Sequence, residues 1–142
     1  TYKKMPFLRI APICNGKIYV APRSYQGEEP GKLDIPMEDY IYACKTDTDK
    51  YAKEVENKYS NHITGQPEPR FSLKHLVKET NGVKKIIMLY ILPLNDEEQI
   101  HFTGGKFVTP EEIEMNSAQY SSFLKEEVDH LNIVAQMWEE FK

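Results

Sequence analysis

The chain has 142 residues, of which 40% are hydrophobic and 28% are charged, and its formal net charge at pH 7 is −4. This length suits one domain with a substantial core, and this composition excludes a disordered chain. An acidic balance disfavours nucleic-acid binding, which needs a basic surface, and no apolar run approaches the ~18 residues that span a membrane. We therefore expect one domain over residues 1–142, without nucleic-acid or membrane partners.

The two cysteines, Cys14 and Cys44, are far apart in the sequence and match no metal-binding spacing. Both are next to apolar residues, which favours buried, reduced thiols over a disulfide. No signal peptide is recognisable in the sequence. These features predict a cytoplasmic protein.

The first predicted elements form a hairpin. Apolar runs over residues 7–14 and 17–21 are joined by Asn15-Gly16, a pair that favours a type I′ turn because both residues tolerate positive φ. A loop rich in glycine, proline and charge is expected over residues 24–32. Residues 33–36 then resemble a short apolar strand, after which we expect a loop that leads to a helix.

This helix is expected to begin near Thr46–Thr48, three residues of the types that cap helix N-termini. Tyr51, Val55 and Tyr59 recur every four residues, so they predict one apolar face that covers the core. The helix should end near residues 60–62, because turn-forming residues follow.

The next segment predicts a long hairpin, with strands over residues 71–80 and 83–94 joined by Asn81-Gly82. The second strand contains a nearly continuous apolar run, which is typical of a strand covered on both faces. A polar turn should follow over residues 95–99, and a short strand should begin at 100–102.

Two helices are expected at the end of the sequence. Thr109 precedes a proline and lies three residues before Glu112, which predicts a capped short helix that ends near Met115. Ser121 or Ser122 should cap a final amphipathic helix that extends through residue 141. Together with the strands, these helices predict an α/β fold in which a mixed sheet lies between helices.

Three segments give the sequence a resemblance to the Nudix hydrolase superfamily. PICNGKIYVAPR (residues 12–23) resembles the hairpin with which the family opens, and LDIP (33–36) resembles the strand before its signature. KFVTPEEI (106–113) resembles its late strand and capped helix. The resemblance extends over nearly the whole chain and implies an α/β/α sandwich with a central mixed sheet.

The family signature is G-x5-E-x7-R-E-U-x-E-E-x-G-U, where U is aliphatic, and its clustered glutamates hold Mg²⁺ or Mn²⁺ on one helical face. Its R-E-U segment matches Lys53-Glu54-Val55 in this sequence. The later glutamates then fall on Asn57 and Lys58, and the first falls on Lys45. Only Glu54 and Val55 agree, so the resemblance implies a degenerate signature that has lost most of its metal ligands.

Two functions are open at this point. In the first, a Nudix-like domain binds a nucleotide, another phosphorylated ligand or a partner protein without standard hydrolysis, and it needs no cofactor. In the second, the chain is a hydrolase of nucleoside diphosphate derivatives. That enzyme would use Mg²⁺ or Mn²⁺ on a rearranged acidic set around Glu54, with Glu38, Asp39 or Glu56.

Four residues are the candidates for a site. Glu54 is the candidate catalytic residue and metal ligand, and its alternative role is that of a solvated helix carboxylate. Arg23 could contact a ligand phosphate, because a guanidinium group suits phosphate, or it could form an ordinary ion pair. Glu38 and Asp39 could add carboxylates to a ligand-binding site, or they could serve the local loop.

Overall fold

The computed structural model describes residues 7–40, 48–78 and 84–142. The strands are β1 (Phe7–Cys14), β2 (Lys17–Pro22), β3 (Leu33–Asp34), β4 (Met37–Tyr40), β5 (Arg70–Lys78), β6 (Lys84–Pro93) and β7 (Lys106–Val108). The helices are α1 (Thr48–Lys58), α2 (Pro110–Met115) and α3 (Ser122–Glu140). Three short 3-10 turns complete the order: η1 (Ser60–His62), η2 (Glu97–Gln99) and η3 (Ser117–Gln119).

The described strands form a mixed sheet with the order β3-β2-β1-β6-β5, while β4 also pairs with β1 and β7 with β2. The β1–β6 pair is parallel, and the other pairs are antiparallel. On one side, β1 has two neighbours, because its first half pairs with β4 and its end pairs with β2. The sheet therefore divides beside β1, and the short segment from β3 to β4 crosses this division.

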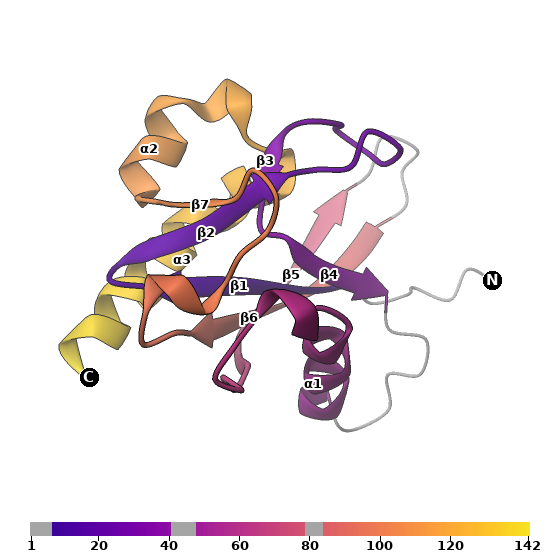
Figure 1. The fold of residues 1–142 in the computed structure, drawn as a ribbon. Coiled ribbons are helices and arrows are strands. Elements are labelled where there is room, and N and C mark those ends of the chain that lie inside the picture. Colours follow the sequence, from indigo (N-terminus) through magenta and orange to yellow (C-terminus); the bar gives the residue numbers. More distant parts are fainter. Residues whose placement is uncertain (1–6, 41–47, 79–83) are drawn as a thin grey trace.

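The core has one layer on each side of the sheet. Along β6, Tyr90 and Leu92 pack in the cluster that includes Ala52 and Val55 of α1. Leu89 and Ile91 pack in the opposite cluster, with residues of α2 and α3. Figure 1 shows the same arrangement, with α2 and α3 together and α1 away from them. The predicted α/β fold, with a central two-sided strand and a mixed sheet between helices, is confirmed.

Several local predictions are also confirmed. Asn15 and Gly16 have φ values of 55° and 75°, as a type I′ turn requires. The Thr109 side chain accepts a hydrogen bond from the Glu112 N–H at 3.2 Å, and Ser121 caps α3 in the same way. Cys14 is a buried free thiol. Other predicted features lie outside the described residues, namely the Asn81-Gly82 turn, the cap residues Thr46 and Asp47, and Cys44 and Lys45.

The segment after residue 36 was predicted as a loop, and this prediction is wrong for Met37–Tyr40, which form β4. Met37 is fully buried opposite Ile10, and Glu38 lies opposite Arg9 on the neighbouring strand. The polar residues of β4 do not predict a strand in this position. One of them, Glu38, faces a buried guanidinium group instead of solvent.

The prediction that a short strand begins at residues 100–102 is also wrong. Ile100 forms only an isolated bridge with Ile63. The ladder does not continue, because the Phe102 N–H donates to the hydroxyl of Tyr19 at 2.7 Å instead of to a strand neighbour. The carbonyl of Phe102 accepts a hydrogen bond from the N–H of Gly105 at 2.8 Å, which closes a turn.

Within the described part of the chain, no helix has both the length and the apolar character needed to cross a bilayer.

Candidate functional site

A cavity of about 500 Å³ opens where the sheet divides. We call it the Arg23 cavity. It is lined by residues 21–24, 27–28, 34–36 and 38, by Tyr59 and His62, and by Phe102 and Thr103. Two of the candidate residues from the sequence, Arg23 and Glu38, are therefore brought together in one cavity.

A buried guanidinium group underlies this cavity. The side chain of Arg9 is fully buried, and each of its three nitrogens is hydrogen-bonded to a carboxylate. Nε contacts both oxygens of Glu127 at 3.1 and 3.0 Å, and Nη2 bridges Glu127 and Asp34 at 2.8 and 2.7 Å. Nη1 donates to Asp34 at 3.1 Å and to Glu38 at 2.6 Å. Arg9 thus joins α3, β3 and β4 beneath the cavity.

A second guanidinium group holds the same two carboxylates from the cavity side. Nη1 of Arg23 lies 2.5 Å from Asp34 and 3.1 Å from Glu38, and Nε donates to the carbonyl of Glu28 at 2.8 Å. The Arg23 side chain is 13% exposed. Nη2 has no acceptor among the described residues, so its two N–H groups remain able to donate to a ligand.

The two shared carboxylates have opposite pKa shifts. Burial alone would raise the pKa of Asp34, but the charges and hydrogen bonds of Arg9 and Arg23 outweigh it and hold that pKa below its usual value. Burial also raises the pKa of Glu38, and the negative charge of Asp34 adds to the rise, so the two arginines offset only part of it. Burial alone would lower the pKa of Arg9, but the surrounding carboxylates outweigh this effect and raise that pKa above its usual value. Asp34 is therefore the firmly ionised member of the pair.

Three aromatic side chains, of Tyr59, His62 and Phe102, form part of the cavity lining, which we call the aromatic wall. The rings of His62 and Phe102 stack in parallel, with centroids 4.0 Å apart and an interplanar angle of 6°. Tyr59 lies beside Phe102, with its centroid 5.8 Å away, and its hydroxyl donates to the carbonyl of Glu38 at 3.2 Å. His62 is exposed, so its outer face remains accessible to a flat ligand.

The loop over residues 24–32 forms the rim of the cavity and is fixed at both sides. Arg23 donates its N–H to the carbonyl of Lys32 at 2.8 Å and accepts from Gly31 at 3.1 Å, which closes the base of the loop. The carboxylate of Glu29 accepts from the N–H and hydroxyl of Ser122 at the start of α3. The rim is therefore attached to the same helix that carries Glu127.

The remaining candidate residues do not line the Arg23 cavity. Glu54 is exposed on α1. Asp39 forms an ion pair with Lys58. Glu56 is buried and pairs with Lys53, with Oε2 and Nζ 2.8 Å apart.

The Nudix resemblance implies a divalent cation, and the residues present do not fit one. Within residues 7–40, 48–78 and 84–142, no three carboxylate, histidine or cysteine side chains are placed so that they could hold a metal ion. The carboxylates nearest the cavity, Asp34 and Glu38, each form ion pairs with both Arg9 and Arg23. Lys58 brings a further positive charge to the side chain of Asp39.

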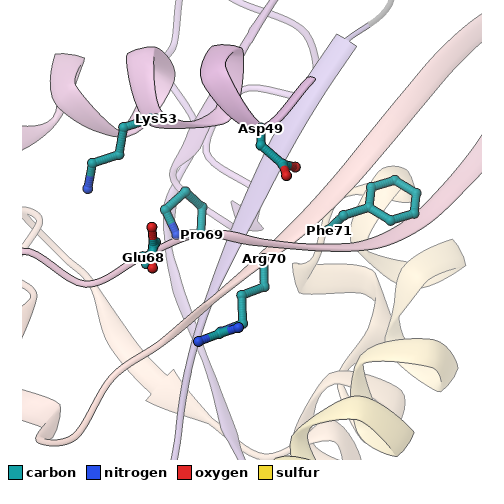
Figure 2. A pocket seen from close by; sticks show the side chains of 6 residues that line it. All are labelled: Asp49, Lys53, Glu68, Pro69, Arg70 and Phe71. Carbon is teal, nitrogen blue, oxygen red and sulfur yellow. The ribbon is translucent and has the colours of Figure 1, made fainter. Parts of the chain in front are cut away.

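A second cavity of about 470 Å³ lies between α1 and the start of β5. Figure 2 shows Asp49 and Lys53 on α1 above the segment from Glu68 to Phe71, which leads into β5, while Arg70 points away from the helix. Asp49 accepts a hydrogen bond from Tyr90 at 2.7 Å, and Lys53 pairs with Glu56. The guanidinium group of Arg70 lies over the ring of Trp138 at 5.4 Å. Three of its charged groups are thus engaged within the protein, so we place the candidate site at the Arg23 cavity.

Sequence reasoning missed Arg9, Asp34 and Glu127. A usable signal was present, because Arg9 is the one charge in the eight-residue apolar run that became β1. Glu127 lies four residues after Phe123 and four before Leu131, on the apolar stripe of α3. A charge on an apolar stripe needs a buried partner, and each of these two residues is the partner of the other.

Comparison with known proteins gives structural matches and no sequence match. No family model and no curated protein matches the sequence. A Nudix hydrolase from Nitrosomonas europaea matches with a TM-score of 0.64 at 11% identity, over 94% of this chain and 91% of that one. The Nudix domain of Shewanella oneidensis NrtR, solved with ADP ribose, matches with a TM-score of 0.61 at 12% identity, over 100% and 91%.

The C-terminal domain of mouse MUTYH, solved in complex with human PCNA, matches as well. Its TM-score is 0.56 at 16% identity, over 98% of this chain and 90% of that one. At such low identities, the likeness concerns the path of the backbone and carries no residue roles.

Proposed function

We propose that this chain, which has the Nudix fold, binds a nucleotide or another phosphorylated ligand in the Arg23 cavity without hydrolysing it by the metal-dependent route. The observation that carries the proposal is the pairing of two unlike walls in one cavity. Arg23 offers a guanidinium edge on one side, and the stacked rings of His62 and Phe102 form the other.

The phosphate end of the ligand is assigned to Arg23. A guanidinium group donates to phosphate oxygens in a fixed planar geometry and keeps its charge at every accessible pH. Its Nη1 and Nε are held by Asp34, Glu38 and the loop carbonyl of Glu28, which fixes the orientation of Nη2 before a ligand arrives. A donor that is already oriented loses less conformational entropy on binding.

The ring end of the ligand is assigned to the aromatic wall. Nδ1 of His62 lies 2.9 Å from the carbonyl oxygen of His101, so this nitrogen carries the proton and donates it. The hydrogen bond and the stacked Phe102 fix the imidazole plane from two directions. A heteroaromatic base can then stack on the outer face of His62, and such stacking tolerates different bases.

The proposal excludes standard hydrolysis because the carboxylates that could hold a metal ion are paired with arginine or lysine side chains. Asp34 and Glu38 are bound by two guanidinium groups, and Asp39 is bound by Lys58. Separating the buried Asp34 from its arginines would leave a charge unpaired in the interior, which costs several kcal/mol. The exposed Glu54 alone is a poor site for Mg²⁺, which prefers several oxygen ligands.

Isothermal titration with ADP-ribose in the presence of EDTA tests the proposal. ADP-ribose is a suitable probe because it combines a base with two phosphates, and the NrtR Nudix domain was solved with it. We expect binding without metal. Arg23→Lys keeps the positive charge but loses the planar fork, so it should weaken binding about tenfold or more. Lys17→Met, at a partly exposed cation outside the cavity, is the matched control and should change nothing.

Two outcomes would overturn the proposal. One is the absence of binding for ADP-ribose, ADP and pyrophosphate alike. The other is turnover of ADP-ribose in Mg²⁺ or Mn²⁺ that disappears in Glu54→Gln, which would establish the hydrolase hypothesis instead. Circular dichroism of each variant separates loss of binding from loss of folding.

A further inference from the structure

The outer face of α3 carries an apolar ridge that covers no part of the described core. Ile133, Met137 and Phe141 are spaced four residues apart, so they lie side by side along the helix and its C-terminal end. Their exposed fractions are 59%, 51% and 81%. The opposite face of the helix supplies Leu124, Leu131 and other core residues, so α3 is already anchored without the ridge.

Carboxylates flank this ridge. Glu126, Ile133 and Glu140 are seven residues apart, which places them along one line of the helix. All three are exposed. Asp129 lies one turn before Ile133, on the same face. We use the name α3 ridge for Glu126, Asp129, Ile133, Met137, Glu140 and Phe141 together.

Helix α2 adds another carboxylate beside this face. The carboxyl groups of Glu114 and Asp129 interact with each other, which raises the pKa of Glu114. Both residues are exposed, and Met115, which follows Glu114, is 82% exposed. Two acidic groups held together on an open surface repel when both are ionised, so a cation placed beside them would be bound favourably.

A second copy of the chain fits this surface poorly. Pairing two α3 ridges would bring the acidic residues of both copies to one interface, and each copy already has a net charge of −4. Like charges across an interface oppose association.

We propose that the α3 ridge and Glu114 dock a basic amphipathic helix of another protein. Large apolar side chains of that helix would pack on Ile133, Met137 and Phe141. Its lysines or arginines would lie against the carboxylates of Glu126, Asp129 and Glu114. Apolar anchors in such helices recur at three- and four-residue spacing, which matches the spacing on α3. Flexible methionine side chains adapt well to a partner of this kind.

The probe for this inference is a fluorescent synthetic helix of about five turns, with leucines on one face and lysines beside them. Its control has the same leucines and glutamates in place of the lysines. In fluorescence anisotropy, the lysine peptide should bind, and rising salt should weaken its binding. The glutamate peptide should not bind, so equal binding of the two peptides would contradict the inference.

Surface variants locate the binding. Ile133→Ser with Met137→Ser should weaken binding of the lysine peptide about tenfold or more, because central apolar anchors carry most of such an interface. Asp129→Asn should weaken it less and reduce its salt dependence. The matched control is Leu76→Ser, at a residue of β5 that is 56% exposed and lies outside the ridge; it should leave binding unchanged.

Two further results would overturn this proposal. Binding that survives the double substitution would place the peptide elsewhere. Sedimentation that shows a dimer abolished by Met137→Ser would make the second copy the occupant of the ridge. Neither result depends on the Arg23 cavity, so ADP-ribose titration of the same variants tests the two sites separately.

Discussion

The carboxylate of Glu127 on α3 binds Arg9 on β1 through Nε and Nη2, at 3.0 and 2.8 Å, although 118 residues separate the two in the sequence. Both side chains are fully buried. The other edge of the same guanidinium group reaches Asp34 and Glu38, which face the Arg23 cavity. A helix on one side of the sheet is thereby connected to the walls of the candidate site.

Removing Arg9 should be strongly destabilising. Arg9→Met leaves the carboxylates of Asp34, Glu38 and Glu127 close together, with Arg23 as the remaining arginine. Breaking a buried ion pair by removing one partner typically costs about 3–5 kcal/mol, because the other charge stays buried without compensation. Urea unfolding at neutral pH measures the loss in the free energy of unfolding.

A double substitution separates charge from packing at this position. Arg9→Met with Glu127→Leu removes one cation and one of its partners together, so it should be less destabilising than Arg9→Met alone. Lys17→Met is the surface control, since Lys17 and Glu97 are partly exposed with Nζ and Oε2 3.8 Å apart, and such pairs contribute about 0–1 kcal/mol. A double variant less stable than Arg9→Met would show that apolar contacts, not charge balance, dominate the cluster.

Asp34 should stabilise the fold in a pH-dependent way. Its folded pKa lies below the reference value of 3.8, so its contribution is fully present above that value and is lost as the pH falls through the lowered folded pKa. Asp34→Asn should therefore cost about 3 kcal/mol at neutral pH. The difference between wild type and variant should stay constant down to about pH 5 and shrink below 3.8. Unfolding curves at several pH values measure this difference.

The contribution of Glu38 to stability should change with pH in the opposite direction to that of Asp34. Its folded pKa lies above the reference value of 4.5, so the protonated form favours folding, and this gain is lost as the pH rises through the folded pKa. Glu38→Gln resembles the protonated acid and should cost less at neutral pH than Asp34→Asn. The wild type should gain stability over this variant as the pH falls toward 4.5. Parallel slopes for the two variants would contradict the opposite shifts.

Much of the fold follows from local sequence signals. The apolar run of β6 predicts a strand buried on both faces, and Asn15-Gly16 predicts the first turn. These signals work because each depends on residues adjacent in the chain. The strand β4 could not be predicted in this way, because the side chain of Glu38 contacts Arg9, 29 residues earlier, instead of facing solvent.

The candidate site was predictable only in part. Arg23 and Glu38 are predicted from the sequence as ligand-binding residues, and both line the cavity. The aromatic wall is not predicted from the sequence, because its rings His62 and Phe102 come from separate segments of the chain, at η1 and just before the turn at Gly104-Gly105. The role of Glu127 depends on a partner 118 residues away, and a pattern of helical spacing does not identify such a partner.

Gly105 should tolerate no side chain, because the turn it forms packs against Tyr19. A Cβ at this position would lie 2.5 Å from Cζ of Tyr19 and closer still to its hydroxyl, which accepts the Phe102 N–H. Tyr19 is buried and cannot move aside without disturbing Phe102. Gly105→Ala should therefore destabilise the fold by about 1–3 kcal/mol, the usual cost of overpacking.

The same substitution should weaken ADP-ribose binding, because Phe102 supports the stacked face of His62. Gly27→Ala is the matched control, since a Cβ there meets only the carbonyl oxygen of Ser24 at 3.9 Å although Gly27 also lines the Arg23 cavity. It should leave the free energy of unfolding nearly unchanged, within the effect of about 0.4–1 kcal/mol that a restricted unfolded chain produces. If Gly105→Ala lowers stability and leaves ADP-ribose affinity intact, the aromatic wall is not part of the binding site, and the ligand contacts Arg23 alone.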